Sequence, residues 1–219
     1  MFQNLDWSVL WNLLLSVVPA LVCITVHEYC HGLVALRLGD TTARDMGRLS
    51  LNPLKHIDFF GLLMMAAFGF GWAKPVPIDM RRFRNPKRGM ALTAVAGPVS
   101  NLLLAALTLF VYGLLWPYLK NASGAGKYLY YGIYRTAYIS TAFAVFNVIP
   151  IPPLDGSKVL FSLISDEAYY KLMRYEKYGM LILFALILTG VLDGPLGTAV
   201  NFVFGKLLYV AQFGSTLLG

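Results

Sequence analysis

The chain has 219 residues and a formal net charge of +7, with 58% hydrophobic and only 13% charged residues. Soluble domains carry about 25% charged residues, so the composition excludes a mainly water-facing exterior. Ten of the 18 Lys and Arg residues lie between Arg37 and Arg88, beside long apolar segments. That placement is typical of residues that orient a protein in a membrane, and it argues against nucleic acid as a partner.

The first predicted element is an apolar span from about Val9 to about Leu36. We expect no cleaved leader, because residues 1–8 contain an acidic residue and no basic one. A long basic loop follows, and within it Phe59–Phe70 is apolar but short. A straight crossing takes about 20 residues, so this stretch predicts a re-entrant or interfacial element. Two glycines and two prolines in 69–77 then predict a loop or a short hairpin.

Further spans are expected at about Met90–Tyr118 and Ile133–Ile149, joined by the polar linker Lys120–Lys127. A polar stretch, interpreted as a loop, separates them from an apolar segment at Tyr178–Leu192. The apolar tail from Leu196 is expected to be a short span or a surface-lying helix.

These elements predict an all-α polytopic membrane protein of about 4–6 transmembrane or re-entrant helices. It would include a small membrane-associated loop or β-hairpin near residues 69–80. We expect a single integral-membrane domain over 1–219, with a catalytic core at about 9–160 and C-terminal membrane segments at about 178–214.

Charge predicts the orientation of the spans. The loop from Arg37 to Arg88 holds ten basic residues against four acidic ones, whereas the segment before the first span carries only Asp6. The positive-inside rule therefore places the loop in the cytoplasm and the N-terminus outside. If Phe59–Phe70 does not cross, the third span returns the chain to the cytoplasm just before Asp155.

A metal-binding motif, His27-Glu28-Tyr29-Cys30-His31, lies near the end of the first span. Histidines at positions i and i+4 share one helix face, so both imidazoles can bind one Zn²⁺. Glu28 lies close to the same face and can take a proton from a water on that metal. Ionisable groups inside a span cost roughly 2.5–3.5 kcal/mol each on insertion scales, which favours a function for this cluster.

A catalytic zinc needs a third protein ligand and one open position. His56 is one candidate, although a juxtamembrane polar residue is the simpler interpretation. Asp155 is the preferred candidate, because it follows Pro150-Ile151-Pro152-Pro153-Leu154 directly after a span and on the predicted side of His31. A non-helical path at membrane depth is tolerated where it lines a cavity.

In combination, these motifs resemble the site-2 protease family of intramembrane zinc metalloproteases. The resemblance rests on the His27–His31 motif and on Asn147-x-x-Pro150-x-Pro152-Pro153-Leu154-Asp155-Gly156. It extends to the segments Gly47–Pro53, His56–Asp58, Gly71–Pro77 and Gly97–Asn101. These matches cover about residues 20–160, and the chain is a small form with no stretch long enough for an inserted peptide-binding domain of about 80–100 residues.

The resemblance implies one zinc per chain, bound by His27, His31 and Asp155, with Glu28 as general base. It implies that Asn147, and more weakly Asn101, contacts the substrate or the oxyanion, with a helix-end cap and interhelical hydrogen bonding as the respective alternatives. It further implies that the loop with Gly71, Trp72, Lys74 and Pro75 holds the substrate as an added strand, with a plain surface turn as the alternative.

The expected function is therefore hydrolysis of peptide bonds in transmembrane protein substrates. We expect the lipid bilayer to surround the protein and the site to face the cytoplasm, and the resemblance implies that the membrane is the bacterial cytoplasmic membrane. An alternative is a non-enzymatic metal-binding or metal-transport protein that uses the same residues. A protease of the type that processes prenylated proteins fits poorly, because its downstream glutamate would have to be Glu167 or Glu176, both in the polar stretch. The sequence predicts neither the substrate nor the oligomeric state.

Overall fold

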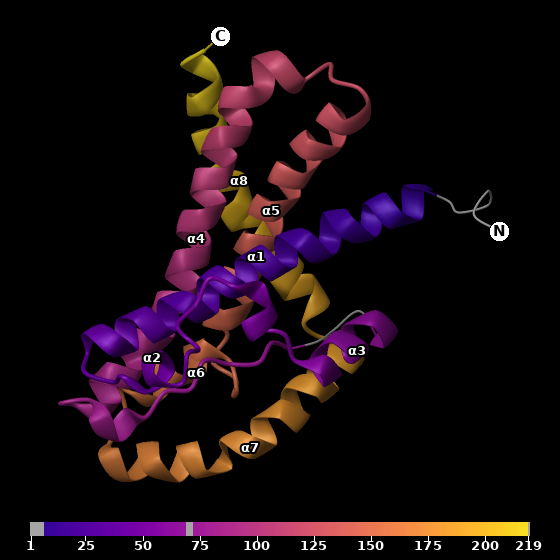
Figure 1. Ribbon diagram of the computed structural model, residues 1–219. Helices are drawn as coiled ribbons and strands as arrows, with labels where there is room; N and C mark the ends of the chain where they lie inside the picture. Colours follow the sequence, from indigo (N-terminus) through magenta and orange to yellow (C-terminus); the bar gives the residue numbers. More distant parts are fainter. Residues whose placement is uncertain (1–6, 69–71, 219) are drawn as a thin grey trace.

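A computed structural model describes residues 7–68 and 72–218 of the chain (Figure 1). Helices dominate this described part, and a short turn of 3-10 helix occurs at Pro53–Lys55 and at Met80–Arg82. The α-helices are α1 (Trp7–Arg37), α2 (Thr42–Asp45), α3 (Phe59–Phe68), α4 (Pro86–Leu119), α5 (Gly124–Val148), α6 (Asp155–Phe161), α7 (Asp166–Leu188) and α8 (Asp193–Thr216).

Three described helices are long and apolar enough to cross a membrane, and they fall at Leu14–Arg37, Pro86–Leu119 and Asp193–Thr216. The expected all-α polytopic fold is confirmed, and the C-terminal tail proves long enough to be a span. α3 has 10 residues, about 15 Å of helix, which is half of the hydrocarbon thickness.

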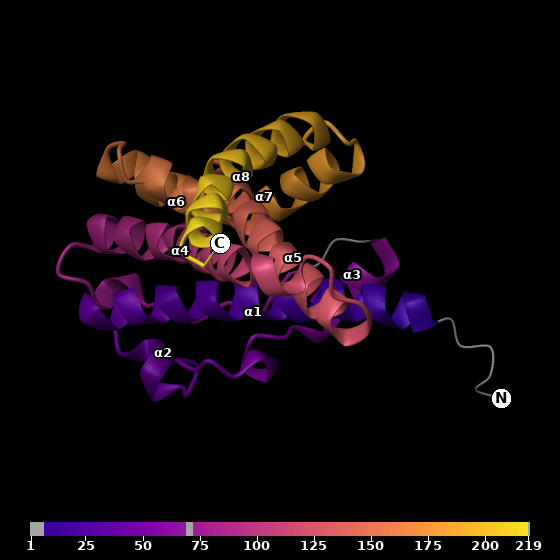
Figure 2. The same ribbon diagram turned by 90° about the horizontal axis from the view of Figure 1, so that it is seen from above.

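α4 is the central helix and packs against α1, α5 and α8 (Figures 1 and 2). Its contact with α8 is close because Gly113 has no side chain: a Cβ there would lie 2.0 Å from the carbonyl oxygen of Ala211. Leu109 of α4, Ala137 of α5 and Phe204 of α8 form a buried cluster beside this crossing. Small residues at such contacts are the usual way for membrane helices to approach each other.

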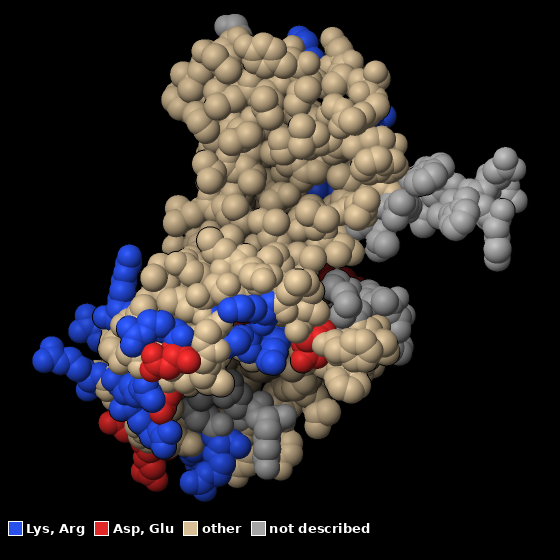
Figure 3. All heavy atoms as spheres, in the orientation of Figure 1, with Lys and Arg blue, Asp and Glu red and all other residues tan. Residues whose placement is uncertain are grey.

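Charged side chains are concentrated at one end of the molecule. In Figure 3 the Lys and Arg residues gather over the end that holds α2 and the start of α4, whereas the upper part of the same face is mostly uncharged. Exposed apolar side chains, among them Leu103, Leu107 and Phe213, cover the long helices. A belt of apolar surface with a charged end is the exterior that a bilayer requires.

Two sequence-based predictions were wrong in the connecting segments. The linker expected at Lys120–Lys127 is shorter, because α5 already begins at Gly124. The polar stretch interpreted as a loop is largely helical, and α7 runs from Asp166 through both Glu167 and Glu176. Its start has ordinary capping chemistry, since the Ser165 hydroxyl accepts a hydrogen bond from the N–H of Ala168 and acidic residues occupy the first turn.

The segment expected to be a loop or hairpin is extended over 72–79, and residues 69–71 lie outside the described part. It has one antiparallel bridge, Ile57 with Ala73, and no assigned strand among the described residues. The N–H of Lys74 donates to the carbonyl of His56, and the guanidinium of Arg48 donates to the carbonyls of Lys74 and Pro75. The loop alternative therefore describes the visible part of this segment.

Candidate metal centre

The helical repeat of α1 places His27 and His31 one turn apart on a face that points into the protein. Both imidazoles are buried, and their ring centroids lie 4.5 Å apart at an interplanar angle of 87°. A ligand atom of Glu28 lies within 4.8 Å of one from each histidine, so these three residues form a possible metal-binding group. The motif predicted from the sequence is thus assembled in space.

Asp155 reaches the two histidines from a distant part of the chain. α5 ends at Val148, the proline-rich segment turns the backbone, and α6 begins at Asp155 itself. Gly156 permits this tight return, because a Cβ there would lie 2.1 Å from the Val148 carbonyl oxygen. Asp155 Oδ2 lies 3.1 Å from His27 Nε2 and 3.2 Å from His31 Nε2.

The donor set fits a divalent metal. His31 Nδ1 is 2.7 Å from the Thr93 carbonyl oxygen, so Nδ1 carries the proton and Nε2 presents a lone pair toward Asp155. Asp155 Oδ2 is buried and has no hydrogen-bond partner among the described residues. Lone pairs that face each other inside a protein repel unless a cation lies between them. Tetrahedral zinc with bonds of about 2.0–2.1 Å separates its ligand atoms by about 3.3 Å, close to the spacing of this group.

The charge state of Asp155 suits this role. Burial acts to raise its pKa, but imidazoles that carry a proton on Nε2 outweigh burial and hold the pKa well below its ordinary value, and a cation in place of those protons would act in the same direction. Lys158 Nζ lies 3.9 Å from the other oxygen, Oδ1, and adds to the positive surroundings. The side chain is therefore a carboxylate at neutral pH, as a metal ligand must be.

Gly97 of α4 makes room for the histidines. A Cβ at this position would lie 2.5 Å from His27 Cε1 and 2.5 Å from His31 Nε2. A side chain in that place would force the imidazole rings, or α1 and α4 themselves, to shift. The sequence pointed to the Gly97–Asn101 segment, but it did not show that the glycine faces both rings.

A small cavity of about 140 Å³ adjoins the metal-binding group. Its walls come from α1, α4, α6, the end of α5 and the extended segment 72–79. The residues that line it are His27, Glu28, His31, Pro75, Val76, Ile78, Met90, Thr93, Ala94, Asn147, Pro153, Asp155 and Lys158. Sequence reasoning missed Val76, Ile78, Thr93 and Lys158. Thr93 carried a signal, since it is a polar residue one turn before Gly97 in an apolar span.

The extended segment contacts the predicted general base directly. The N–H of Val76 donates to Glu28 Oε2 at 2.8 Å, while Pro75 and Ile78 line the cavity beside it. Trp72 and Lys74 are exposed and do not line the cavity, and Gly71 lies outside the described residues. The segment therefore borders the candidate site over part of its length.

The two asparagines named as candidates occupy different places. Asn147 lines the cavity, and its amide donates to the carbonyl of Phe143 one turn earlier. Asn101 is fully buried, does not line the cavity, and lies with Nδ2 3.2 Å from His27 Nδ1. The alternative ligand, His56, is apart from the centre and donates from Nε2 to the carbonyl of Ser50 at 2.8 Å.

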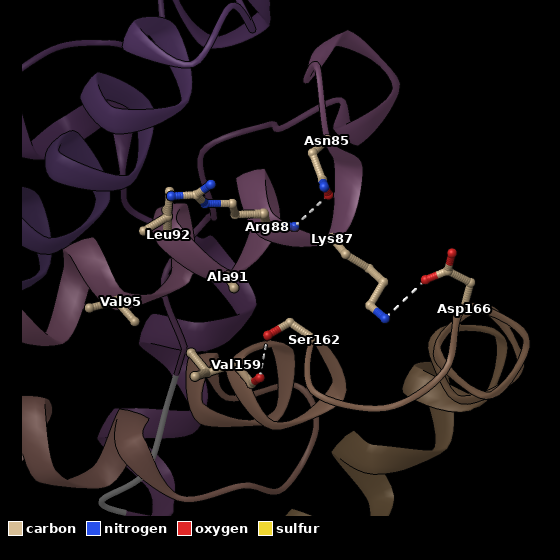
Figure 4. Close-up of a pocket in the computed structure, with 9 residues that line it drawn as sticks. All are labelled: Asn85, Lys87, Arg88, Ala91, Leu92, Val95, Val159, Ser162 and Asp166. Carbon is tan, nitrogen blue, oxygen red and sulfur yellow. Dashed lines mark hydrogen bonds and ion pairs between the residues drawn. The ribbon is translucent and has the colours of Figure 1, made fainter.

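A second cavity lies on other faces of α4 and α6 (Figure 4). It is an open groove of about 540 Å³, lined by Asn85, Lys87, Arg88, Ala91, Leu92, Val95, Val159, Ser162 and Asp166. Lys87 forms an ion pair with Asp166 at 2.9 Å and donates to the carbonyl of Ile164. These contacts join the start of α4 to the start of α7.

Comparison with known proteins finds one family model and several relatives of this chain. The family model of peptidase family M50 matches residues 123–190, which include Asp155. The "Putative zinc metalloprotease YwhC" of Bacillus subtilis is 36% identical over 187 residues, which cover 84% of this chain and 82% of the relative. The "Putative zinc metalloprotease Rip2" of Mycobacterium tuberculosis is 29% identical over 205 residues, 90% of this chain and 76% of the relative.

The protein of the same name from Mycolicibacterium smegmatis is 29% identical over 178 residues, 79% of this chain and 66% of the relative. No solved structure matches the chain. Three observations support one assignment: the helices can span a membrane, the donor set fits zinc, and the Bacillus relative matches most of the chain at 36% identity. The chain belongs to peptidase family M50, the site-2 protease family, and is a membrane zinc metalloprotease.

Proposed function

We propose that His27, His31 and Asp155 bind the catalytic zinc and that Glu28 is the general base for hydrolysis of peptide bonds in transmembrane protein substrates. The observation that carries this proposal is the convergence of Asp155 Oδ2 on both histidine Nε2 atoms, at 3.1 and 3.2 Å. Family membership favours this enzyme over the alternative of a metal-transport protein.

The bound metal supplies Lewis-acid chemistry, since it polarises the scissile carbonyl and lowers the pKa of water. Glu28 takes the proton of the attacking water and later gives it to the leaving amine. The Val76 N–H holds Glu28 Oε2 and leaves Oε1 to carry that proton. The amide of Asn147 lies at the cavity wall, where it can turn from the Phe143 carbonyl toward a developing oxyanion.

The setting of the site favours substrates that come from the bilayer. α1 runs through the apolar belt to Arg37, and the motif lies in the last third of this helix. The basic loop that follows supports a cytoplasmic location for this end of α1 by the positive-inside rule. We therefore propose the bacterial cell membrane as the location, with the site open toward the cytoplasm.

The substrate must be extended before attack, because a helical peptide bond is shielded by its own hydrogen bonds. The extended segment 72–79 borders both Glu28 and the cavity, so it is the part of the chain suited to hold an unwound substrate. Pro75 would contact that substrate at the cavity wall, and Trp72 and Lys74 would lie along it outside the cavity.

Substitution of Glu28 by Gln tests the proposal. It should abolish proteolysis while the purified protein keeps one zinc per chain, because Gln retains an oxygen that accepts from Val76 but cannot carry the proton. The measurement compares membrane proteomes of cells with wild-type and Glu28→Gln protein for fragments that disappear and precursors that accumulate. Glu167→Gln, an exposed change on α7, is the matched control. Undiminished cleavage by Glu28→Gln would exclude Glu28 as the base.

A further inference from the structure

We propose that Asn101 is a positioning residue, which fixes the proton of His27 on Nδ1 and so leaves Nε2 free for the metal. This inference rests on the zinc ligands proposed above and assigns Asn101 a role other than substrate contact. Asn101 lies in the middle of α4, is 0% exposed, and its amide Nδ2 is 3.2 Å from His27 Nδ1. It forms no wall of the cavity, so a substrate in the cavity would not touch it.

The proton count around Asn101 supports a specific orientation of its amide. With Nδ2 toward His27, Nδ1 would have to accept, and Asn101 Oδ1 would stay buried without a partner among the described residues. Either orientation leaves one buried atom of the amide without a partner among the described residues, so the two differ at His27: a Nδ1 that accepts puts the proton of the neutral imidazole on Nε2, where it excludes a metal. The oxygen and nitrogen of a carboxamide exchange places by a half-turn of the side chain. After that half-turn Oδ1 accepts from His27 Nδ1–H, and Nε2 presents its lone pair toward Asp155.

The second histidine has the same arrangement. His31 Nδ1 donates to the Thr93 carbonyl of α4 at 2.7 Å. Thr93, Gly97 and Asn101 are spaced by four residues, so they share one face of α4. His27 and His31 are spaced identically on α1, and the missing side chain of Gly97 admits both rings between the two acceptors.

Asn101 is itself held in place by a third helix. The hydroxyl of Ser140 on α5 donates to the Asn101 main-chain carbonyl at 2.7 Å, and Ser140 is fully buried. This bond fixes the Asn101 backbone, from which the side chain reaches His27. Partners of this kind around a metal ligand affect metal affinity by about 10–100-fold.

Three variants test this role by zinc binding, measured with purified protein at buffered concentrations of free zinc. Asn101→Leu keeps the branched shape and the four heavy atoms of the side chain but has no acceptor, and it should bind zinc about 10–100-fold more weakly than wild type. Asn101→Asp keeps an acceptor beside Nδ1 and should bind zinc within a few-fold of wild type. Asn201→Leu, the same change at an exposed position on α8, is the control and should leave zinc affinity unchanged.

Rescue by aspartate separates positioning from packing, because a purely structural role would not distinguish an acceptor from a methyl group. If Asn101→Leu binds zinc as tightly as wild type, or if Asn101→Asp is as weak as Asn101→Leu, the proposal is wrong. A wild-type protein that binds no zinc would instead contradict the ligand assignment. Full cleavage by Glu28→Gln would contradict only the general base.

Discussion

The two cavities of this protein share α4 and α6 as walls but differ in how their polar groups are satisfied. The groove at the start of α4 is the larger, at about 540 Å³ against about 140 Å³. In the groove Lys87 pairs with Asp166, Asn85 caps the N–H of Arg88, and the Ser162 hydroxyl donates to a carbonyl of its own helix. In the smaller cavity Asp155 Oδ2 faces two imidazole nitrogens and has no hydrogen-bond partner among the described residues.

Unsatisfied lone pairs therefore mark the reactive centre better than size does. Buried polar groups are normally paired, and a cluster that is unpaired in the same place needs an ion to complete it. The groove needs none, because its walls supply their own partners. Substitutions on the two sides of α4 and α6 should thus have effects of different kinds.

The largest effect is expected for Asp155→Ala. Residues that only orient a metal ligand already affect metal affinity by about 10–100-fold, so loss of a ligand should exceed ~100-fold. Proteolysis should fall below detection. Metal analysis of the purified protein and cleavage of a membrane substrate measure the two effects, with Asp166→Ala in the groove as control. A variant that retained its full zinc content would remove Asp155 from the ligand set.

Gly97→Ala should have the next largest effect. The added Cβ would lie 2.5 Å from both imidazoles, so the rings, or the helices that carry them, must shift. A shift of about 1 Å at reacting groups can cost about 10²-fold in rate. Activity and zinc content are compared with those of Gly197→Ala on α8, where no described atom lies within 4 Å of the new Cβ. Wild-type activity in Gly97→Ala would show that the two helices are not closely packed there.

The local part of this centre could be predicted from the sequence. His27, Glu28 and His31 need only a helix to share a face, and Asp155 needs only a proline-rich turn on the same side of the membrane. The supporting contacts depend on how the segments pack. The contacts of Thr93 with His31 and of Val76 with Glu28 depend on the register between α1, α4 and the extended segment. No local sequence pattern encodes that register.

At the start of α7, by contrast, the sequence did contain a local signal, but the prediction missed it. Its polar residues suggested a loop, because hydrophobic periodicity is a weak guide where a helix leaves the apolar belt. The capping residue Ser165 with Asp166 and Glu167 was the better signal.

Lys87→Met tests the groove and should change stability with little effect on catalysis. The methionine keeps the apolar stem but loses the ion pair with Asp166 and the hydrogen bond to the Ile164 carbonyl. The free energy of unfolding should fall by about 1–2 kcal/mol. Thermal unfolding in detergent measures this change, while zinc content and cleavage rate should stay within about twofold of wild type, since Lys87 lines the groove and not the smaller cavity. A loss of zinc in this variant would show that the two cavities are coupled through α4 or α6.

The smallest effect is expected for Asp166→Asn, which weakens the same ion pair from its exposed side. The Asp166 side chain is 78% exposed, so its pairing with Lys87 is worth only a few tenths of a kcal/mol and is screened by salt. The difference in unfolding temperature from wild type should therefore be small at low salt and vanish near 1 M, where the screening length is about 3 Å. The loss of zinc caused by Asp155→Ala should persist at both salt concentrations, because the Asp155 carboxylate is buried and dissolved salt screens buried charges much less than exposed ones. A salt-independent destabilisation by Asp166→Asn would mean that the Lys87–Asp166 ion pair is shielded from dissolved salt as well as the buried Asp155 is. The two cavities would then differ only in whether their polar groups are paired.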